Sequence, residues 1–183
     1  MSNTFPRTKR SVFGYNVEQV EDFLKDARRA YDAADAETPQ LVSKEIRHTA
    51  FVMQKGGYSP RHVDAAMERL EDAFAQRERD RNAAQLGAEG LLQLARQDAQ
   101  VILDRLLRPA NEKFRRAGSL TTGYSRKEVD AFAQRIVSYF QEGTAVTVDE
   151  VRTAVFSPER RGYDETQVDL VLDGVIDVML AVR

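Results

Sequence analysis

One short sequence motif occurs four times in this chain of 183 residues, and it constrains the fold more than any other feature. The motif is Gly-Tyr, a residue with a short hydrogen-bond-accepting side chain, three variable positions, Val and an acid. The copies occupy residues 14–21, 57–64, 123–130 and 162–169. Because internal repeats reveal the architecture of a chain, four recurrences predict four equivalent structural elements.

Each copy predicts the start of a helix. The third motif residue suits the N-cap position, where it satisfies free amides of the first turn; these residues are Asn16, Ser59, Ser125 and Asp164. Gln19, Glu128 and Gln167 stand three residues later and are expected to complete capping boxes. The Tyr before each cap and the Val after it form a hydrophobic staple, and the Gly supplies a permissive turn. A helix start explains neither the constant Tyr nor the constant acid.

Apolar residues continue after each motif at spacings of three and four, as in Val20, Leu24 and Ala27, so each helix presents one packing face. A shorter helix is expected before the second and fourth copies. There, Phe51 and Phe156 each stand seven residues before the motif Tyr. The chain is therefore interpreted as a duplicated pair of helix-loop-helix units.

The predicted fold class is an all-α helical bundle with two duplicated halves and a pseudo-twofold axis. No segment alternates with period two for long enough to predict a strand. We expect two repeats in residues 1–85, a connecting helix and linker in 86–117, and two repeats in 118–183. The connecting helix should span 86–107 and end before Pro109.

Composition favours a cytoplasmic globular protein without catalytic chemistry. The chain is 42% hydrophobic, lacks cysteine and has 27 basic against 29 acidic residues, so no strong field attracts polyanions. We expect neither a signal peptide nor a membrane span, because aspartates interrupt the most apolar segment. His48 and His62 lack the spacing of metal ligands, and no phosphate-binding loop is present. No enzyme activity, metal or cofactor is therefore expected.

The second unit, with Ile46, Phe51 and the motif at 57–64, resembles the amino-terminal domain of the DivIVA family. The fourth, from Val151, resembles it too, and Phe23-Leu24 matches the Phe-Leu that follows the family motif. The chain is similar to actinobacterial proteins with repeated DivIVA domains. The resemblance implies a scaffold for cell division, polar growth or cell-envelope organisation at the inner membrane face, at a septum or pole. Its implied partners are other proteins, itself and, weakly, lipid.

The resemblance also implies that the loop before Gly-Tyr touches lipid through an aromatic and a basic residue. At the two positions before the motif Gly, only the first copy has two apolar residues, Val12-Phe13. Only the fourth copy has two basic residues at these positions, Arg160-Arg161. The candidate membrane or partner contacts are Phe5, Arg7, Phe13, Arg160 and Arg161. Together with Lys9 and Arg10, the first three could form a basic-aromatic lipid foot. The alternative is a solvated terminus with Phe13 packed into the core.

Two further alternatives remain open at this level. Gly-Tyr-Ser at a helix start is similar to the recognition helix of helix-turn-helix regulators, although the apolar faces and the negative net charge disfavour nucleic acid. The cluster Lys113, Arg115 and Arg116 could bind phosphate or lipid, but it is interpreted as surface, as is usual for a three-residue cluster beside an aromatic residue. The repeat positions expected to carry structure or interaction are Gly14, Tyr15, Val20, Glu21, Phe51, Gly57, Tyr58, Val63, Asp64, Gly123, Tyr124, Val129, Asp130, Phe156, Gly162, Tyr163, Val168 and Asp169.

Overall fold

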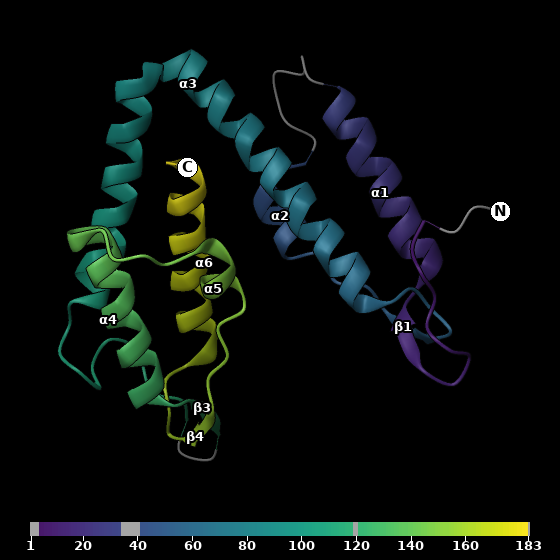
Figure 1. Cartoon of the computed structure of the whole chain (residues 1–183). Coiled ribbons are helices and arrows are strands. Elements are labelled where there is room, and N and C mark those ends of the chain that lie inside the picture. Colours follow the sequence, from purple (N-terminus) through teal and green to yellow (C-terminus); the bar gives the residue numbers. More distant parts are fainter. Residues whose placement is uncertain (1–3, 34–40, 119–120, 183) are drawn as a thin grey trace. The chain divides into compact units, whose positions relative to one another are not determined.

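The chain is mostly helical in the computed structural model, which describes residues 4–33, 41–118 and 121–182 (Figure 1). The elements in order are β1 (Phe13–Tyr15), α1 (Val17–Asp32), α2 (Ser43–Arg47), β2 (Met53–Lys55), α3 (Pro60–Leu106), β3 (Thr122–Tyr124), α4 (Arg126–Glu142), α5 (Val148–Arg152), β4 (Pro158–Arg160) and α6 (Glu165–Ala181). The predicted predominance of helix is confirmed. None of the described helices combines the length and the apolar character that a bilayer span requires.

The strands form two short antiparallel ribbons that the sequence did not predict. In the β1–β2 ribbon Gly14 lies opposite Gln54, and in the β3–β4 ribbon Gly123 lies opposite Glu159. Each strand has only three residues, which is too short for an alternating pattern to stand out. Both ribbons contain a motif Gly-Tyr, so the motif lies at a strand-to-helix junction.

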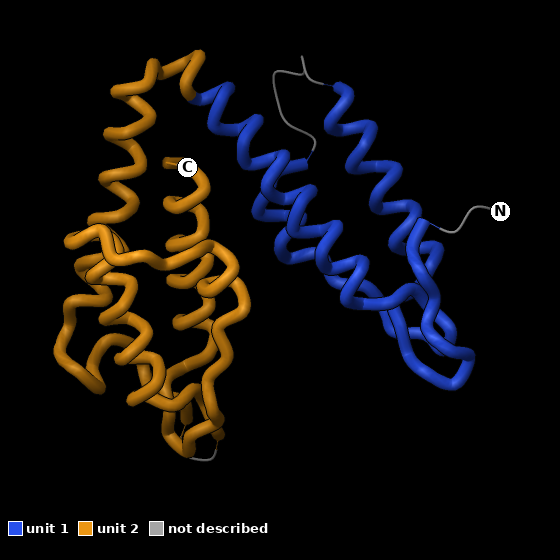
Figure 2. Tube along the Cα trace, in the orientation of Figure 1, with its two compact units in different colours: residues 1–82 blue, residues 83–183 orange. Residues whose placement is uncertain are grey.

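The chain divides into two compact units, residues 1–82 and 83–183, shown separately coloured in Figure 2. Each unit contains one ribbon, one five-residue helix and two long helices that begin at motif copies. The helix expected at 86–107 corresponds to the carboxyl-terminal part of α3. This part of α3 belongs to unit 2, whereas the amino-terminal part belongs to unit 1. Within α3 the backbone leaves helical geometry at Gly87 (φ 73°, ψ 165°), a conformation that is essentially restricted to glycine.

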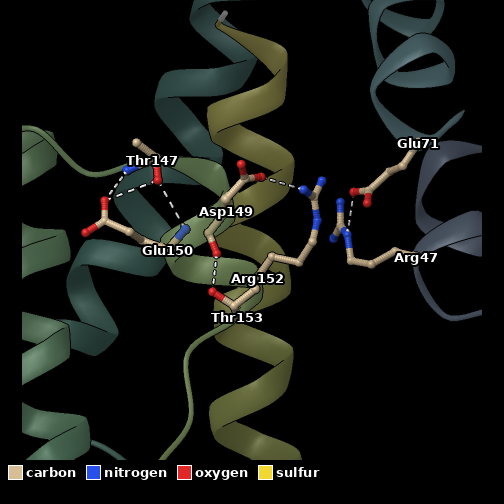
Figure 3. Close-up of polar contacts among 7 residues, drawn as sticks. All are labelled: Arg47, Glu71, Thr147, Asp149, Glu150, Arg152 and Thr153. Atoms are coloured by element: carbon tan, nitrogen blue, oxygen red, sulfur yellow. Dashed lines mark hydrogen bonds and ion pairs between the residues drawn. The ribbon is translucent and has the colours of Figure 1, made fainter. Parts of the chain in front are cut away.

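Several helix ends follow directly from local sequence. The Asn16 side chain accepts a hydrogen bond from the Gln19 amide at 2.9 Å, as expected for an N-cap. The capping box of α5 is confirmed in both directions: Glu150 N donates to Thr147 Oγ1 at 3.1 Å, and Thr147 N donates to Glu150 Oε2 at 2.8 Å (Figure 3). At the other end of α4, Gly143 adopts the left-handed conformation that closes many helices.

Each unit has its own core around the motif residues. In unit 1, Val20, Tyr58 and Val63 are at most 1% exposed and form one cluster, against which Tyr15 packs. The Tyr and Val expected to form a staple within each copy are thus packed together with the Tyr and Val of the other copy. Nearby, α2 is tied to α3 by a buried ion pair in which Arg47 Nε lies 2.8 Å from Glu71 Oε1 (Figure 3).

In unit 2 the motif valines are buried in the same way, and α3 contributes further apolar side chains. Ile102 of α3 packs close to Gly174 of α6: a Cβ atom built on Gly174 would lie 3.4 Å from Ile102 Cδ1. Unit 2 therefore has a third long helix segment in its core. Both cores hold the helix starts, and with them the ribbons, in fixed positions.

Candidate functional site: the crossed motifs and the ribbon tips

The two motif copies of each unit cross each other through their tyrosine backbones. In unit 1, Tyr15 N donates to Tyr58 O and Tyr58 N donates to Tyr15 O, both at 2.9 Å. In unit 2, Tyr124 N donates to Tyr163 O at 3.0 Å, and Tyr163 N donates to Tyr124 O at 2.9 Å. We call each pair of copies, joined in this reciprocal way, the crossed motifs.

The motif glycines are required by this close crossing and not by a turn. A Cβ atom on Gly14 would lie 2.4 Å from Tyr58 O, and one on Gly57 would lie 2.3 Å from Tyr15 O. The corresponding distances are 2.1 Å for Gly123 and 2.4 Å for Gly162. None of these four glycines has a positive φ, so the prediction of a permissive turn was wrong. Glycine is needed because any side chain would collide with the opposite backbone.

The tyrosine hydroxyl of each copy reaches the motif acid of the other copy. Tyr58 Oη donates to Glu21 Oε1 at 2.5 Å in unit 1, and Tyr163 Oη donates to Asp130 Oδ1 at 2.9 Å in unit 2. For the two remaining hydroxyls the facing acids are Asp64 for Tyr15 and Asp169 for Tyr124, and each acid contributes to a raised pKa of its tyrosine. This reciprocity accounts for the constant Tyr and the constant acid. A phenylalanine would fill the core equally well but would leave a carboxylate without its donor.

The protonation of three of these tyrosines, Tyr15, Tyr124 and Tyr163, is stabilised by their surroundings. Burial and then the hydrogen bond to Asp130 raise the pKa of Tyr163 to about 12. Burial, followed by interactions with Asp64, raises the pKa of Tyr15. Burial and the negative charge of Asp169 raise the pKa of Tyr124. Each hydroxyl therefore remains a donor throughout the neutral range.

The expected capping boxes at three motif copies are not formed, because the side chains bind another segment. Gln19 Oε1 accepts from Val52 N at 2.8 Å, and Glu128 Oε2 accepts from Ser157 N at 2.7 Å. Gln167 Oε1 likewise accepts from an amide outside its own helix, that of Arg115, at 2.9 Å. The capping residues donate their own amides to the same segments, as when Asn16 N bonds Val52 O.

The second copy differs at this point for a physical reason. Its helix cap, Ser59, donates its amide to Pro6 O at 2.9 Å. Proline has no amide hydrogen, so the docked segment offers nothing for a side-chain acceptor to bind. The position held elsewhere by Gln or Glu is His62, whose Nδ1 lies 3.0 Å from Ser59 Oγ. His62 thus has a local role at the helix start.

A phenylalanine precedes each docked residue and packs on the tyrosine of the neighbouring copy. Phe51 contacts Tyr15 with ring centroids 5.6 Å apart, and Phe156 contacts Tyr124 at 5.3 Å. Phe5 on Tyr58 and Phe114 on Tyr163 complete the set, at 5.4 Å and 5.2 Å. Phe5 is half-buried here, so it is a packing residue of the crossed motifs.

The roles of Phe5 and Phe114 were missed from sequence, although a signal existed. Phe5 stands ten residues before Tyr15, and Phe114 stands ten residues before Tyr124. The two phenylalanines are therefore separated by the same distance along the chain as these two motif tyrosines. Arg7, another candidate contact residue, also lies against Tyr58, with its guanidinium 5.8 Å from the ring centroid. Lys113 was also misplaced as surface: it is 7% exposed, and its Nζ donates to the carbonyls of Leu106 and Arg108 after α3.

The ribbon tip of unit 1, residues 9–13 and 53–56, exposes apolar side chains among basic ones. Phe13 is 54% exposed, so the alternative that packed it into the core is wrong. Val12 and Met53 are exposed beside it, and Lys55 Nζ lies 5.9 Å from the Phe13 ring centroid. Lys9 and Arg10 are exposed as well.

The ribbon tip of unit 2, residues 121–122 and 158–161, has a different surface. Thr122 lies opposite Arg160, where unit 1 pairs Phe13 with Lys55. Arg160 and Arg161 are both exposed. Below the tip, Arg126 forms a two-pronged contact with Glu159, at 3.0 Å and 2.9 Å. The two units thus share the crossed motifs and differ at the tips.

The structure brings the predicted repeat residues into the crossed motifs, except Phe51 and Phe156, which pack on Tyr15 and Tyr124 from the docked segments. Glu21 and Asp130 accept hydrogen bonds from tyrosine hydroxyls of the other copy, so these motif acids help to hold the two copies of a unit together. Within the described residues, no group of three or more His, Asp or Glu side chains is placed to hold a metal ion. A scan against protein-family models matches no family, and searches of curated proteins and of solved structures find no similar protein.

Proposed function

We propose that the chain is a non-catalytic interaction scaffold of the DivIVA type, linked to cell division, polar growth or cell-envelope organisation. The four motif copies derive from one helix-loop-helix unit, and in each unit two copies pair about an approximate twofold axis. The observation that supports this proposal most is the reciprocal backbone pairing of the motif tyrosines, reinforced in each unit by a tyrosine hydroxyl that donates to the acid of the other copy. It uses the polar groups of the motif inside the fold and leaves the exterior for partners.

The crossing supports the family resemblance in a specific way. In the family the motif helices pair between chains, whereas the described pairings here join two copies within one chain. A single chain can therefore present the surface that a homodimer presents, with different residues on its two sides. Divergence between copies, such as His62 in place of Gln19, can then be tolerated because each copy has one fixed partner.

Weak peripheral membrane contact is proposed for the tip of unit 1. Exposed Phe13, Val12 and Met53 can insert at the boundary between headgroups and acyl chains, while Lys9 and Arg10 attract anionic lipid. Insertion by so few side chains gives reversible binding. The protein would then lie at the inner face of the membrane and bind other proteins there.

Vesicle co-sedimentation tests the membrane part of the proposal. The full chain should sediment with vesicles that contain phosphatidylglycerol, and Phe13→Ser should reduce the bound fraction more than Arg160→Ser combined with Arg161→Ser. Thr122→Phe places an aromatic residue at the tip of unit 2 and serves as the matched gain-of-binding variant. Equal sedimentation of wild type and Phe13→Ser would exclude the tip of unit 1 as the contact.

Localisation tests the scaffold role itself. A fluorescent fusion should concentrate at a septum, pole or growing envelope for part of the cell cycle. A fusion that remains diffuse throughout would argue against a scaffold. The helix-turn-helix alternative receives little support, because the faces that begin at Val63 and Val129 are buried within their own units.

A further inference from the structure

The tip of unit 2 and its surroundings carry more basic groups than the fold uses. Arg115 is paired with Asp164 at 2.8 Å and Arg126 with Glu159 at 2.9 Å, so these two cations are neutralised locally. The neighbouring exposed cations form no ion pair with any described residue; they are Arg116, Lys127, Arg160 and Arg161. Glu159 is the one acid among the described residues of the tip and is already paired with Arg126, so Arg160 and Arg161 leave the tip itself with a surplus of positive charge.

Arg161 is held in a backbone conformation that favours glycine. Its φ is 58°, and the residue that precedes the motif Gly in unit 1, Gly56, has a φ of 67°. The same turn is therefore made by glycine in one unit and by arginine in the other. A left-handed conformation costs a residue with a Cβ atom some stability, and such strain is often found where the side chain serves a function. The exposed Arg161 side chain makes no described contact that would offset this cost.

We infer that the tip of unit 2 is a docking surface for an acidic segment of a partner protein, with Arg160 and Arg161 as its central contacts. A guanidinium group offers a planar fork of donors that matches a carboxylate, and exposed arginines suit glutamate-rich or aspartate-rich segments. The described tip has Thr121 and Thr122 where unit 1 has Val12 and Phe13, so it lacks the apolar side chains that lipid insertion uses.

Other anionic partners fit the described tip less well. Single-stranded nucleic acid is bound by aromatic side chains that stack on bases, and the described residues of this tip include none. This inference rests on the proposed scaffold role, because it gives the protein partner of that scaffold a chemical class.

Fluorescence anisotropy of a labelled oligoglutamate peptide with the full chain tests the inference. The double variant Arg160→Ser, Arg161→Gly removes both charges, and Gly suits the left-handed backbone. Binding should weaken about tenfold in this variant, because each exposed ion pair contributes up to roughly a factor of five. Lys25→Gln with Arg61→Gln is the matched control, since it removes two exposed cations from the long helices of unit 1. Its affinity should stay that of the wild type.

Several results would overturn the inference. Unchanged peptide binding in the arginine variant, or an equal loss in the control, would show that the tip of unit 2 has no special role. Loss of binding to anionic vesicles or to duplex DNA, with peptide binding retained, would assign the tip to lipid or to nucleic acid. The arginine variant should unfold at the same temperature as the wild type or higher, which separates lost contacts from lost structure. A diffuse fusion protein with intact peptide binding would reject the scaffold role alone.

Discussion

The two units use the same crossed motifs but present different surfaces at their ribbon tips. In both, the motif tyrosines exchange backbone hydrogen bonds and their hydroxyls meet the acid of the other copy. At the tips, Phe13 and Lys55 in unit 1 correspond to Thr122 and Arg160 in unit 2. The residues that hold two copies together are alike in both units, whereas those that face solvent differ. Binding specificity should therefore differ between units while their stability responds to the same substitutions.

The largest expected effect is the loss of a motif glycine. In Gly123→Ala the new Cβ would lie 2.1 Å from the Tyr163 carbonyl oxygen, a collision between two backbone segments that are both hydrogen-bonded. We expect a loss of about 4 kcal/mol or more in the stability of unit 2, and Gly57→Ala should do the same to unit 1. Hydrogen exchange measured by mass spectrometry would show which unit loses protection.

Gly174→Ala is the matched control for the glycine variants. Its new Cβ would make an ordinary contact, 3.4 Å from Ile102 Cδ1, and alanine favours the helix by up to about 1 kcal/mol. Unit 2 should therefore retain or gain protection. If Gly123→Ala were as stable as Gly174→Ala, the close crossing of the motifs would be refuted.

The next effect is the loss of a tyrosine hydroxyl. Tyr58→Phe and Tyr163→Phe each remove a hydroxyl that donates to a motif acid, although Asp130 keeps the amide of Asn111. A hydrogen bond to a charged group contributes roughly 1.5–3 kcal/mol. Equal losses in the two variants would sharpen the comparison, since the crossed motifs would then be energetically equivalent. Urea unfolding measures the change. Tyr31→Phe serves as control because Tyr31 is 41% exposed, and its stability should stay within about 0.5 kcal/mol of the wild type.

Alkaline pH should weaken the crossed motifs before it affects the rest of the chain. The pKa of Tyr163 is raised from 10.0 to about 12, so the folded state retains a proton that the unfolded state releases. The stabilising contribution is complete below pH 10 and is lost as the pH rises towards 12. Tyrosinate absorbance followed with unfolding should show this loss, and Tyr163→Phe should reduce its slope. A pH dependence identical in wild type and variant would contradict the assignment.

The sequence was sufficient to predict the four helix starts because their capping residues and apolar spacing are local signals. It did not explain the constant Tyr or acid, since their partners lie in the other copy: Tyr58 and Glu21 are 37 residues apart. The glycines were misread for the same reason. Glycine is compatible with a turn and with a close crossing, and only the position of the opposite carbonyl distinguishes the two.

The ribbon tips show a different limit of sequence reasoning. Phe13 was open to either a core or a surface position, because a single aromatic residue between a basic stretch and a motif carries no periodicity. Its exposure follows from the register, which places it opposite Lys55 at the end of the ribbon. The strain at Arg161 left no sequence signal except the contrast with Gly56, which becomes meaningful once both are seen to form the same turn.

The smallest expected effects distinguish the four copies from each other. Glu128 accepts two hydrogen bonds from Ser157, at the amide (2.7 Å) and the hydroxyl (2.9 Å), whereas Gln19 accepts one from Val52 N. Glu128→Ala should therefore cost more than Gln19→Ala, within a range of about 0.5–1.5 kcal/mol. His62→Ala should cost least, because the segment docked on that copy is held through Pro6, which has no amide to bind. Thermal unfolding of the three variants gives the ranking. A cost for His62→Ala as large as that for Glu128→Ala would contradict this ranking, because the energy contributed at this position would then not depend on the segment docked there.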